Sequence, residues 1–366
     1  MMFKKVGIVG LGLIGGSIAK ALKNRLNIKT IVACNRNDDV LVTAYAEGII
    51  DEYAVDVTDI FCGCDIVFIC TPVSSIFSFA KKLTKYVDKS CIISDVGSTK
   101  GNIHNEMKAL EDDIIFIGGH PMTGSEKFRY SASKGHLFEN AFYMLVPADN
   151  VAQNTLDSFK TLIEGFGALP IIVSPDEHDC IVASISHVPH IVASAVCASV
   201  KDLDTDKKHM KTLAAGGFKD ITRIASSSPE MWENICIDNK AQVVKSLDYL
   251  ENVIKNVKKS IANSDENAVY EYFNDAKLYR DSFATATPIS FVKNYEISID
   301  VLDKPGSIAI IAVLFSSNNI NIKNLSIINS REHDSGAMSI AFDSEAQRQK
   351  SVALLKEMNY EVHIKN

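Results

Sequence analysis

A histidine set among glycines is the first feature of this sequence that points to chemistry. The stretch 118–126 reads Gly-Gly-His-Pro-Met-Thr-Gly-Ser-Glu and follows the apolar run 114–117, which predicts a short buried strand. His120 should therefore stand at the carboxyl end of that strand, where open parallel sheets hold their ligands. The glycines let the backbone turn tightly, and Pro121 stiffens the exit. The imidazole either faces a ligand or is satisfied by a neighbouring carbonyl.

A glycine loop near the start indicates dinucleotide binding. The apolar run 5–9 predicts a strand buried on both faces, and a helical pattern begins near Ser17. In a G-x-G-x-x-G loop the first glycine turns the chain, the second lets the backbone approach a pyrophosphate, and the third lets helix pack on strand. The helix N-terminus supplies donors and a dipole for the anion. We predict that NAD or NADP binds at Gly10, Leu11, Gly12, Leu13, Ile14 and Gly15.

The end of the second predicted strand, 30–34, bears on which cofactor binds. An acidic residue about 20 positions beyond the glycines holds the ribose of NAD, whereas an arginine accommodates the phosphate of NADP. The sequence has Asn35, Arg36 and Asn37 there, with Asp38 close by. Arg36 favours NADP. Two alternatives stay open, because Asn35 can still bind a ribose and Arg36 can be a solvated surface charge.

Polar residues also follow two later predicted strands, 65–70 and 91–95. Thr71 and Pro72 follow the first strand and Asp95 ends the second, so both groups should border the cofactor cleft. Ser98 either caps the next helix or contacts substrate or nicotinamide. Strands and helices alternate in this way up to residue 173, which is typical of a doubly wound sheet. The predicted fold class is therefore α/β, with a Rossmann-type domain at 1–173.

Residues 174–285 have a helical pattern and carry a second set of polar residues, which predicts a helical substrate-binding and dimerisation domain. His178 lies in the first expected helix, and His187 and His190 are three apart, so they share a face. Pro189 should kink that helix. Paired histidines can bind a metal, but no carboxylate or thiolate at ligand spacing accompanies these two, so hydrogen-bonding or structural roles are favoured.

Further along this helical region, Asp220 and Arg223 follow a double glycine. Asp220 either orients Arg223 or forms only an exposed ion pair with it. Ser227 or Ser228 should cap a helix that contains the single tryptophan, Trp232. The pattern over 240–261 predicts one long amphipathic helix. Its length favours packing against a second copy of the chain in a homodimer.

Composition excludes several classes of protein. The chain has 366 residues, 23% of them charged, and a net charge of −7. That length predicts two or three domains, and the acidic balance gives no electrostatic reason to expect nucleic acid or an anionic membrane as partner. We expect no signal peptide and no membrane-spanning segment, hence a cytosolic protein.

The eight cysteines lack C-x-x-C spacing, so reduced thiols are favoured over a metal site, including at Cys62 and Cys64.

The last part of the chain predicts a small separate domain. Residues 286–291 are interpreted as a linker, and 292–366 show the strand and helix order βαββαβ of a ferredoxin-like domain. The loop after its first strand contains Asp303, Pro305 and Gly306, and it resembles the ligand loop of ACT domains, which bind amino acids at paired interfaces. The resemblance implies tyrosine as the regulatory ligand. Such a domain can also serve dimerisation alone.

Taken together, the motifs resemble the prephenate dehydrogenase family. This resemblance implies a cytosolic oxidoreductase of tyrosine biosynthesis that converts prephenate to 4-hydroxyphenylpyruvate and CO₂, passes a hydride to NAD or NADP, and is inhibited by tyrosine. The alternatives are an arogenate dehydrogenase, a reductase or hydroxyacid dehydrogenase sharing the cofactor domain, and a catalytically silent amino-acid sensor. The resemblance covers residues 5 to about 283 and rests on the glycine loop, the stretches 95–100 and 119–126, His187-Val188-Pro189-His190, the stretch 217–223, and Trp232.

The same resemblance implies roles for individual residues. His120 contacts the 4-hydroxyl of prephenate, Arg223 anchors a substrate carboxylate, and Ser98 and His190 line the site. Aromatisation drives the loss of CO₂, so no metal is expected. His120 must be neutral to accept from the hydroxyl, so the rate should fall on acidification. In such families the tryptophan can come from the second subunit. The residues expected to bind substrate or to bound the pocket are Glu126, His178, His187, Asp220 and Trp232.

Overall fold

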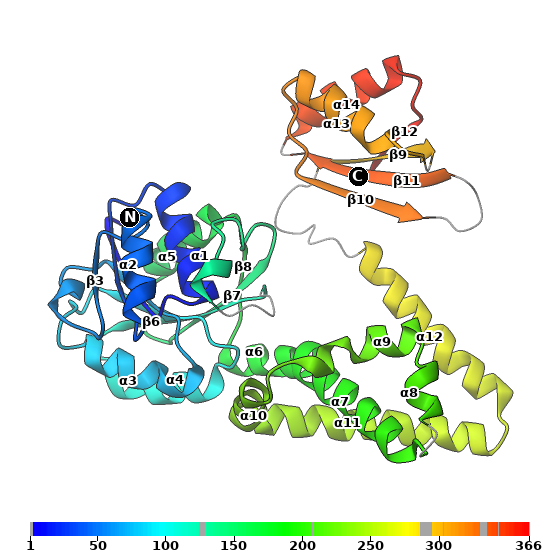
Figure 1. The fold of residues 1–366 in the computed structure, drawn as a ribbon, viewed down its shortest axis with the longest axis horizontal. Helices are drawn as coiled ribbons and strands as arrows, with labels where there is room; N and C mark the ends of the chain where they lie inside the picture. Colours follow the sequence, from blue (N-terminus) through cyan, green and yellow to red (C-terminus); the bar gives the residue numbers. More distant parts are fainter. Residues whose placement is uncertain are drawn as a thin grey trace. The chain divides into compact units, whose positions relative to one another are not determined.

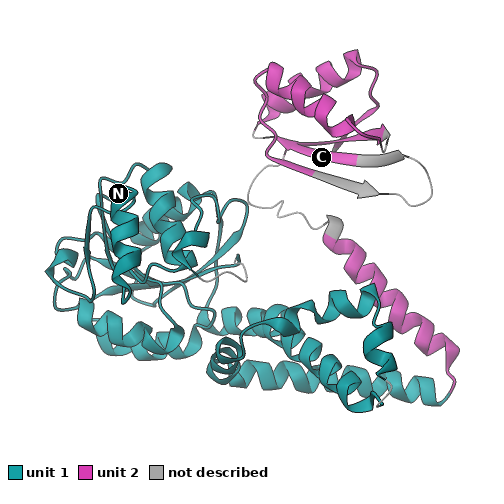
Figure 2. Ribbon diagram, viewed as in Figure 1, with its two compact units in different colours: residues 1–263 teal, residues 264–366 magenta. Residues whose placement is uncertain are grey.

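The computed structural model describes residues 3–123, 129–205, 208–285, 295–302, 304–329, 335–342 and 344–365. It divides into two compact units, residues 1–263 and 264–366 (Figure 2). The boundary predicted at residue 174 lies within the first unit. Glu126, Asp303 and the expected linker 286–291 lie outside the described residues.

An eight-stranded sheet forms the frame of the first unit (Figure 1). Its order is β3-β2-β1-β4-β5-β6-β7-β8, and all neighbours pair in parallel except β6 and β7. This order confirms the predicted doubly wound sheet. The strands are β1 (Lys5–Val9), β2 (Thr30–Cys34), β3 (Glu52–Ala54), β4 (Ile66–Ile69), β5 (Ile92–Asp95), β6 (Ile115–Pro121), β7 (Phe142–Pro147) and β8 (Leu169–Ile172).

Both faces of this sheet are buried, and successive residues of one strand enter different cores. Ile66 and Phe68 of β4 belong to one apolar cluster, whereas Val67 and Ile69 belong to the other. A strand covered on both faces explains the continuous apolar runs in the sequence. The covering helices are α1 (Leu13–Asn24), α2 (Asp38–Ala46), α3 (Val73–Leu83), α4 (Gly101–Met107) and α5 (Gln153–Gly165).

Strand β6 differs from the expectation at the central histidine. The strand continues through His120 to Pro121, because it pairs with β7 over residues 117–121, so Gly118 and Gly119 do not form a turn. These glycines serve close packing instead. A Cβ at Gly118 would lie 2.8 Å from Nε2 of His104, and one at Gly119 would lie 2.7 Å from the backbone oxygen of Asp95. Any larger residue would push β6 away from its neighbours.

The helical part of the first unit follows β8 directly. Its long helix α11 confirms the pattern predicted over 240–261. Ser228 caps α10 by accepting from the Met231 N–H at 3.3 Å, which confirms one of the two expected caps. The elements are α6 (Pro175–Val182), a π-helical turn η4 (Ala183–His187), α7 (Val188–Leu203), α8 (His209–Leu213), α9 (Gly216–Thr222), a 3₁₀ turn η5 (Arg223–Ser226), α10 (Pro229–Asp238) and α11 (Lys240–Ala262).

The segments α6, η4 and α7 join into one helix, Pro175–Leu203. The π turn lies just before Pro189, which lacks an N–H and crowds the preceding turn, so the expected irregularity is present as a change of helical register. Among the described residues, this helix alone is long and apolar enough to cross a membrane, with a mean hydropathy of 1.7. Length and composition alone do not distinguish a membrane span from a core helix, so the expectation of no membrane-spanning segment stays a prediction.

The second unit contains a four-stranded antiparallel sheet with the order β10-β11-β9-β12. This order confirms the predicted ferredoxin-like βαββαβ arrangement, with Ile297, Ile299, Phe315 and Phe342 in its core. Gly306 precedes its first helix with a φ of +94°, a conformation that favours glycine. The elements are α12 (Glu266–Thr285), β9 (Tyr295–Leu302), α13 (Ser307–Ser317), β10 (Asn324–Asn329), β11 (Ser335–Phe342), α14 (Glu345–Glu357) and β12 (Val362–Lys365).

Candidate active site

Two histidines and an aspartate form a chain of hydrogen bonds at the carboxyl end of β6. Nδ1 of His120 lies 2.8 Å from Nε2 of His178, and Nδ1 of His178 lies 2.7 Å from Oδ1 of Asp179. The start of α4 fixes the aspartate, because the N–H groups of Lys100 and Gly101 donate to its two oxygens, each at 2.8 Å. Strand β6 therefore supplies His120 to the site, and helix α6, which follows the sheet, supplies His178 and Asp179. We call these three side chains, His120, His178 and Asp179, the relay.

The relay determines where each imidazole carries its proton. Burial opposes ionisation of Asp179, but hydrogen bonds from His178, Gly101 and Lys100 outweigh it and lower its pKa, so the carboxylate accepts. Burial lowers the pKa of His178, which is therefore neutral and donates from Nδ1. Its Nε2 must then accept the Nδ1 proton of His120.

His120 is left with an unprotonated Nε2. Its pKa lies well below the usual value of 6.5, because of burial first and then repulsion from the Lys100 ammonium, to which His178 and His187 would add when protonated. A neutral imidazole whose proton is on Nδ1 has its free lone pair on Nε2. This side chain can accept a hydrogen bond, or a proton, from a hydroxyl.

A buried ion pair holds the neighbouring loop. Nζ of Lys100 lies 2.8 Å from Oδ2 of Asp95, both side chains are fully buried, and the ammonium also donates to the backbone oxygens of Gly97 and Thr99. The other carboxylate oxygen of Asp95 accepts from the Gly119 N–H at 3.3 Å. Asp95, expected at the cofactor, thus ties loop 96–99 to β6.

Ser98 lies in the loop that this ion pair holds. The serine is half-buried and does not cap α4, since the N-cap residue of that helix is Lys100. The capping alternative for Ser98 was therefore wrong. The contact with substrate or nicotinamide stays a prediction, supported by the position of the loop between β5 and the relay.

The tryptophan of α10 packs on the two histidines of the long helix. The rings of Trp232 and His190 stack at 3.8 Å between centroids, and His187 meets the indole edge-on at 5.9 Å. His187 is buried, which lowers its pKa to about 4, and its Nδ1 lies 3.3 Å from Nδ2 of Asn239. In the described residues, the indole Nε1 of Trp232 is buried without a partner. Trp232 therefore packs against histidines of its own chain, and a contribution of the tryptophan to the site of a second subunit stays a prediction.

Arg223 and Asp220 lie at the outer side of the site. Both side chains are exposed, at the end of α9 and the start of η5. The pKa of His190 is lowered by burial and further by the Arg223 cation, against a backbone hydrogen bond at Ile224 that raises it. Arg223 is therefore within electrostatic reach of the stacked pair His190 and Trp232. Both interpretations of Asp220 stay open.

The glycine loop has the shape that a pyrophosphate requires. Gly10 has a φ of +96°, and a Cβ at Gly15 would lie 2.0 Å from the Gly10 oxygen. Helix α1 begins after Gly12 with no side-chain cap and no acidic residue in its first turn, so its N–H groups and dipole favour an anion. Leu13 and Ile14 open that helix. The loop therefore fits a dinucleotide.

The residues expected around the cofactor gather beside this loop. Oδ1 of Asn35 accepts from the Leu11 N–H at 3.2 Å, and Arg36 is exposed next to it. The hydroxyl of Thr71 is buried and, among the described residues, has no partner, as expected of a group that awaits a ligand. Pro72 is the N-cap residue of α3.

Comparison with known proteins decides the family. Residues 18–172 match the model of the prephenate dehydrogenase nucleotide-binding domain, and residues 174–275 match that of its dimerization domain. The prephenate dehydrogenase of Bacillus subtilis strain 168 is 36% identical over 346 residues, which are 94% of this chain and 93% of that protein. The chain belongs to the prephenate dehydrogenase family. The resemblance inferred from the motifs, the oxidoreductase class and the Rossmann-type cofactor domain are thereby confirmed.

Two solved structures resemble this chain. The prephenate dehydrogenase of Aquifex aeolicus, in complex with hydroxyphenyl propionate and NAD⁺, has a TM-score of 0.73 at 31% identity and covers 77% of this chain and 99% of its own. The arogenate dehydrogenase of Synechocystis has a TM-score of 0.70 at 28% identity and covers 76% of this chain and 99% of its own. Both substrates thus occur among the relatives.

Three residues of the site were not found from the sequence. Lys100 resembles an ordinary surface lysine, Asp179 one of several acidic residues at a helix start, and Asn239 a helix-end residue. Their importance comes from burial, which sequence pattern does not show for polar residues. The one available signal was the adjacency of His178 and Asp179.

Proposed function

We propose that this chain oxidatively decarboxylates prephenate to 4-hydroxyphenylpyruvate, with hydride transfer to NAD or NADP, in tyrosine biosynthesis. The observation that carries the proposal is the unprotonated Nε2 of His120, oriented by His178 and Asp179. A neutral acceptor at this point suits a substrate whose reacting carbon carries a hydroxyl. Family membership supports the reaction class.

Bond changes in the reaction explain the need for such an acceptor. The bound nicotinamide supplies the hydride acceptor. As the hydride leaves C4 of the substrate, the bond from C1 to the carboxylate breaks, and its electron pair completes the aromatic ring while CO₂ departs. Positive charge that develops at the 4-hydroxyl is stabilised by His120, and proton shifts along the relay bring that charge beside Asp179. The hydroxyl proton returns to oxygen, so the product is a phenol.

The remaining predicted residues hold the substrate in this proposal. Arg223 anchors a carboxylate, for which its planar guanidinium is suited. The buried Nε1 of Trp232 is an available donor, and Ser98 and His190 line the site. Glu126, His178, His187 and Asp220 keep their predicted roles at the boundary of the pocket.

The cofactor is NAD or NADP, and we propose that the residues after β2 favour NADP. Asn35 has its amide engaged by Leu11 and by the Asn37 oxygen, which leaves the exposed Arg36 as the charged group at the ribose position. Replacing Arg36 with alanine should lower kcat/KM for NADP about tenfold and for NAD less than twofold. Equal losses with both cofactors would refute the preference.

An assay of the purified chain tests the function. Prephenate and arogenate are each incubated with NAD and with NADP, while reduced nicotinamide and the phenolic product are measured. Turnover of prephenate is the expected result. Preferential turnover of arogenate would support the alternative, and turnover of neither would leave the silent amino-acid sensor.

We further propose a homodimer in the cytosol. The helix Pro175–Leu203 has only 28% of its most apolar window buried within this chain, which a second copy would cover. A membrane position is disfavoured, because His178, Asp179 and His187 of this helix are buried against the rest of the unit. Light scattering on the purified chain should give twice the mass of one chain.

Regulation by tyrosine is proposed for the second unit. Gly306 is the N-cap residue of α13, and Pro305 directly precedes it, at the position of the ligand loop that the ACT resemblance implies. Asp303, the third residue predicted for that loop, lies outside the described residues. Tyrosine should lower prephenate turnover by the full chain, and the Gly306→Val variant should lose that response while keeping its basal rate. If tyrosine inhibited the Gly306→Val variant as strongly as the wild type, this loop would not be the tyrosine-binding site.

A further inference from the structure

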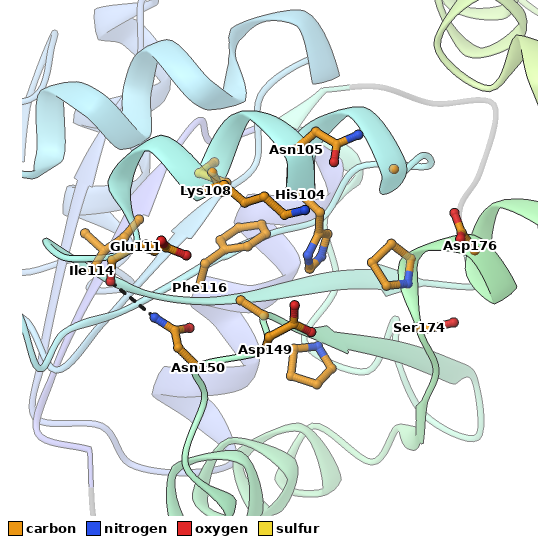
Figure 3. Close-up of a pocket in the computed structure, with 15 residues that line it drawn as sticks. His104, Asn105, Lys108, Glu111, Ile114, Phe116, Asp149, Asn150, Ser174 and Asp176 are labelled. Carbon is orange, nitrogen blue, oxygen red and sulfur yellow. Dashed lines mark hydrogen bonds between the residues drawn. The ribbon is translucent and has the colours of Figure 1, made fainter.

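A cavity lies beside α4, and neither the glycine loop nor His120 lines it. Its volume is about 270 Å³, enough for a small molecule of amino-acid size. Figure 3 shows its walls, which come from α4 and the 3₁₀ turn η2 (Lys108–Leu110), from β6, from the segment after β7, and from the start of α6. The floor is apolar, with Met107, Ile114 and Phe116 buried there.

Charged groups of both signs stand around this floor. Lys108 is one cation, and the carboxylates belong to Glu111, Asp149 and Asp176. Across the part of the chain that the structure describes, none of these four side chains forms a hydrogen bond or an ion pair. In Figure 3 the Lys108 ammonium lies on one side of the Phe116 ring and the Asp149 carboxylate on the other. An occupant with separated positive and negative ends would meet both.

A buried histidine packs behind the Phe116 ring in the wall of the cavity. His104 is 7% exposed, packs edge-on against Phe116 at 5.0 Å, and has its Nε2 without a partner among the described residues. Burial lowers its pKa to about 4, so the imidazole is neutral. Its Nε2 faces Gly118, where a Cβ would lie 2.8 Å away, so His104 contributes a ring face and no hydrogen bond to an occupant of the cavity.

We propose that this cavity binds an α-amino acid with an aromatic side chain. The ammonium group would face Asp149 and its neighbouring carboxylates, the carboxylate would face Lys108, and the ring would lie on the floor beside Phe116 and His104. An organic anion would be repelled by the three carboxylates, although it could pair with Lys108. A simple amine could pair with a carboxylate but would leave Lys108 without a partner. A zwitterionic amino acid has an ammonium group for the carboxylates and a carboxylate for Lys108. The site goes beyond the proposed function, which it does not require.

The cavity shares a helix with the relay. Gly101 lines the cavity, and its N–H holds one carboxylate oxygen of Asp179 at 2.8 Å. An occupant would therefore contact the helix that orients His178. This is a route by which an amino acid in the first unit could act on the reaction without touching the substrate.

Calorimetric titration of the full chain tests the proposal. The active site is first saturated with NAD and 3-(4-hydroxyphenyl)propionate, and L-phenylalanine and L-tyrosine are then titrated into the wild type, Lys108→Met, Asp149→Asn and the control Lys85→Met. Lys85 is an exposed lysine outside the cavity, and all three positions are exposed, so folding is not at risk. We expect a class of sites that weakens at least tenfold in Lys108→Met and Asp149→Asn and is unchanged in Lys85→Met.

Two analogues sharpen the result. 3-Phenylpropionate lacks the ammonium group and 2-phenylethylamine lacks the carboxylate, so each should bind at least tenfold more weakly than L-phenylalanine to the Lys108-dependent sites. Identical isotherms for the wild type and both cavity variants would overturn the proposal, whatever binding the second unit contributes. Prephenate turnover, measured on the same preparations, shows separately whether the proposed function holds.

Discussion

The two sides of the candidate active site are built in opposite ways. On the sheet side, His178, Asp179, Lys100 and Asp95 are buried, and each has its partners inside the protein. On the outer side, Arg223 and Asp220 are exposed on a short helix and the turn that follows it. The first arrangement costs desolvation but holds each proton and each ring in one geometry. The second keeps the guanidinium of Arg223 exposed to water, where a substrate carboxylate can reach it.

This difference suggests a division of labour. A relay with fixed tautomers can stabilise charge in a transition state without reorganising, so its loss should appear in kcat. An exposed arginine attracts and anchors a carboxylate in ground and transition state alike, so its loss should appear in KM. The predictions below test this division, from the largest expected effect to the smallest.

The largest effect is expected from His120→Asn. Asparagine can still accept a hydrogen bond but cannot take up a proton, so kcat with prephenate should fall about a thousandfold with little change in KM. Steady-state kinetics on the purified variant measure this. His136→Asn, at an exposed histidine, should be indistinguishable from the wild type. Near wild-type turnover by His120→Asn would remove the imidazole from the reaction.

A smaller loss, about a hundredfold in kcat, is expected from Asp179→Asn. The carboxylate accepts from His178, Lys100 and Gly101. An amide has one acceptor, so in either orientation its NH₂ group meets another N–H, and a reversed His178 would protonate His120 on the wrong nitrogen.

The control for this variant is Asp202→Asn, at an exposed position on α7. Thermal unfolding of both variants separates lost stability, of about 1–3 kcal/mol for an unsatisfied buried group, from lost chemistry. If Asp179→Asn lost stability but kept its kcat, the aspartate would be a structural partner of α4 only.

Much of the architecture could be predicted from sequence because it rests on apolar pattern. The runs 5–9 and 30–34 match β1 and β2, and the pattern over 240–261 matches α11. Such patterns reflect burial of side chains, which period and length report directly. The antiparallel entry of β7 beside β6 was not predictable in this way, since an antiparallel neighbour leaves no mark on a strand that is buried on both faces.

Polar residues of the site show the limit of sequence interpretation. His120 stood out because glycines and a proline surround it, yet its glycines serve packing against Asp95 and His104. Lys100 could not be recognised, because nothing local distinguishes a lysine that is fully buried against an aspartate from an exposed one. Whether such a polar residue is buried in the site depends on contacts with residues far away in the sequence, which local pattern does not show.

A change confined to KM is expected from Arg223→Lys. A lysine keeps the charge but loses the planar pair of donors, so KM for prephenate should rise about tenfold while kcat stays within about threefold. Lys219→Ala, which removes an exposed charge from α9, should alter neither constant more than twofold. A fall in kcat at constant KM would place Arg223 with the relay and break the division of labour.

The smallest expected change is the response of the wild type to mild acid. Burial, followed by repulsion from the Lys100 ammonium, holds the pKa of His120 well below 6.5, and His178 and His187 add to that repulsion only when protonated. The accepting, neutral form therefore persists as pH falls, and kcat/KM should vary less than twofold between pH 8 and pH 6.5 and decline only as pH passes through that lowered pKa. Residual activity of His120→Asn should lack this decline. A decline centred at or above pH 6.5 in the wild type would mean that the histidine is as solvated as the arginine opposite it, and that the two sides of the site are not built differently.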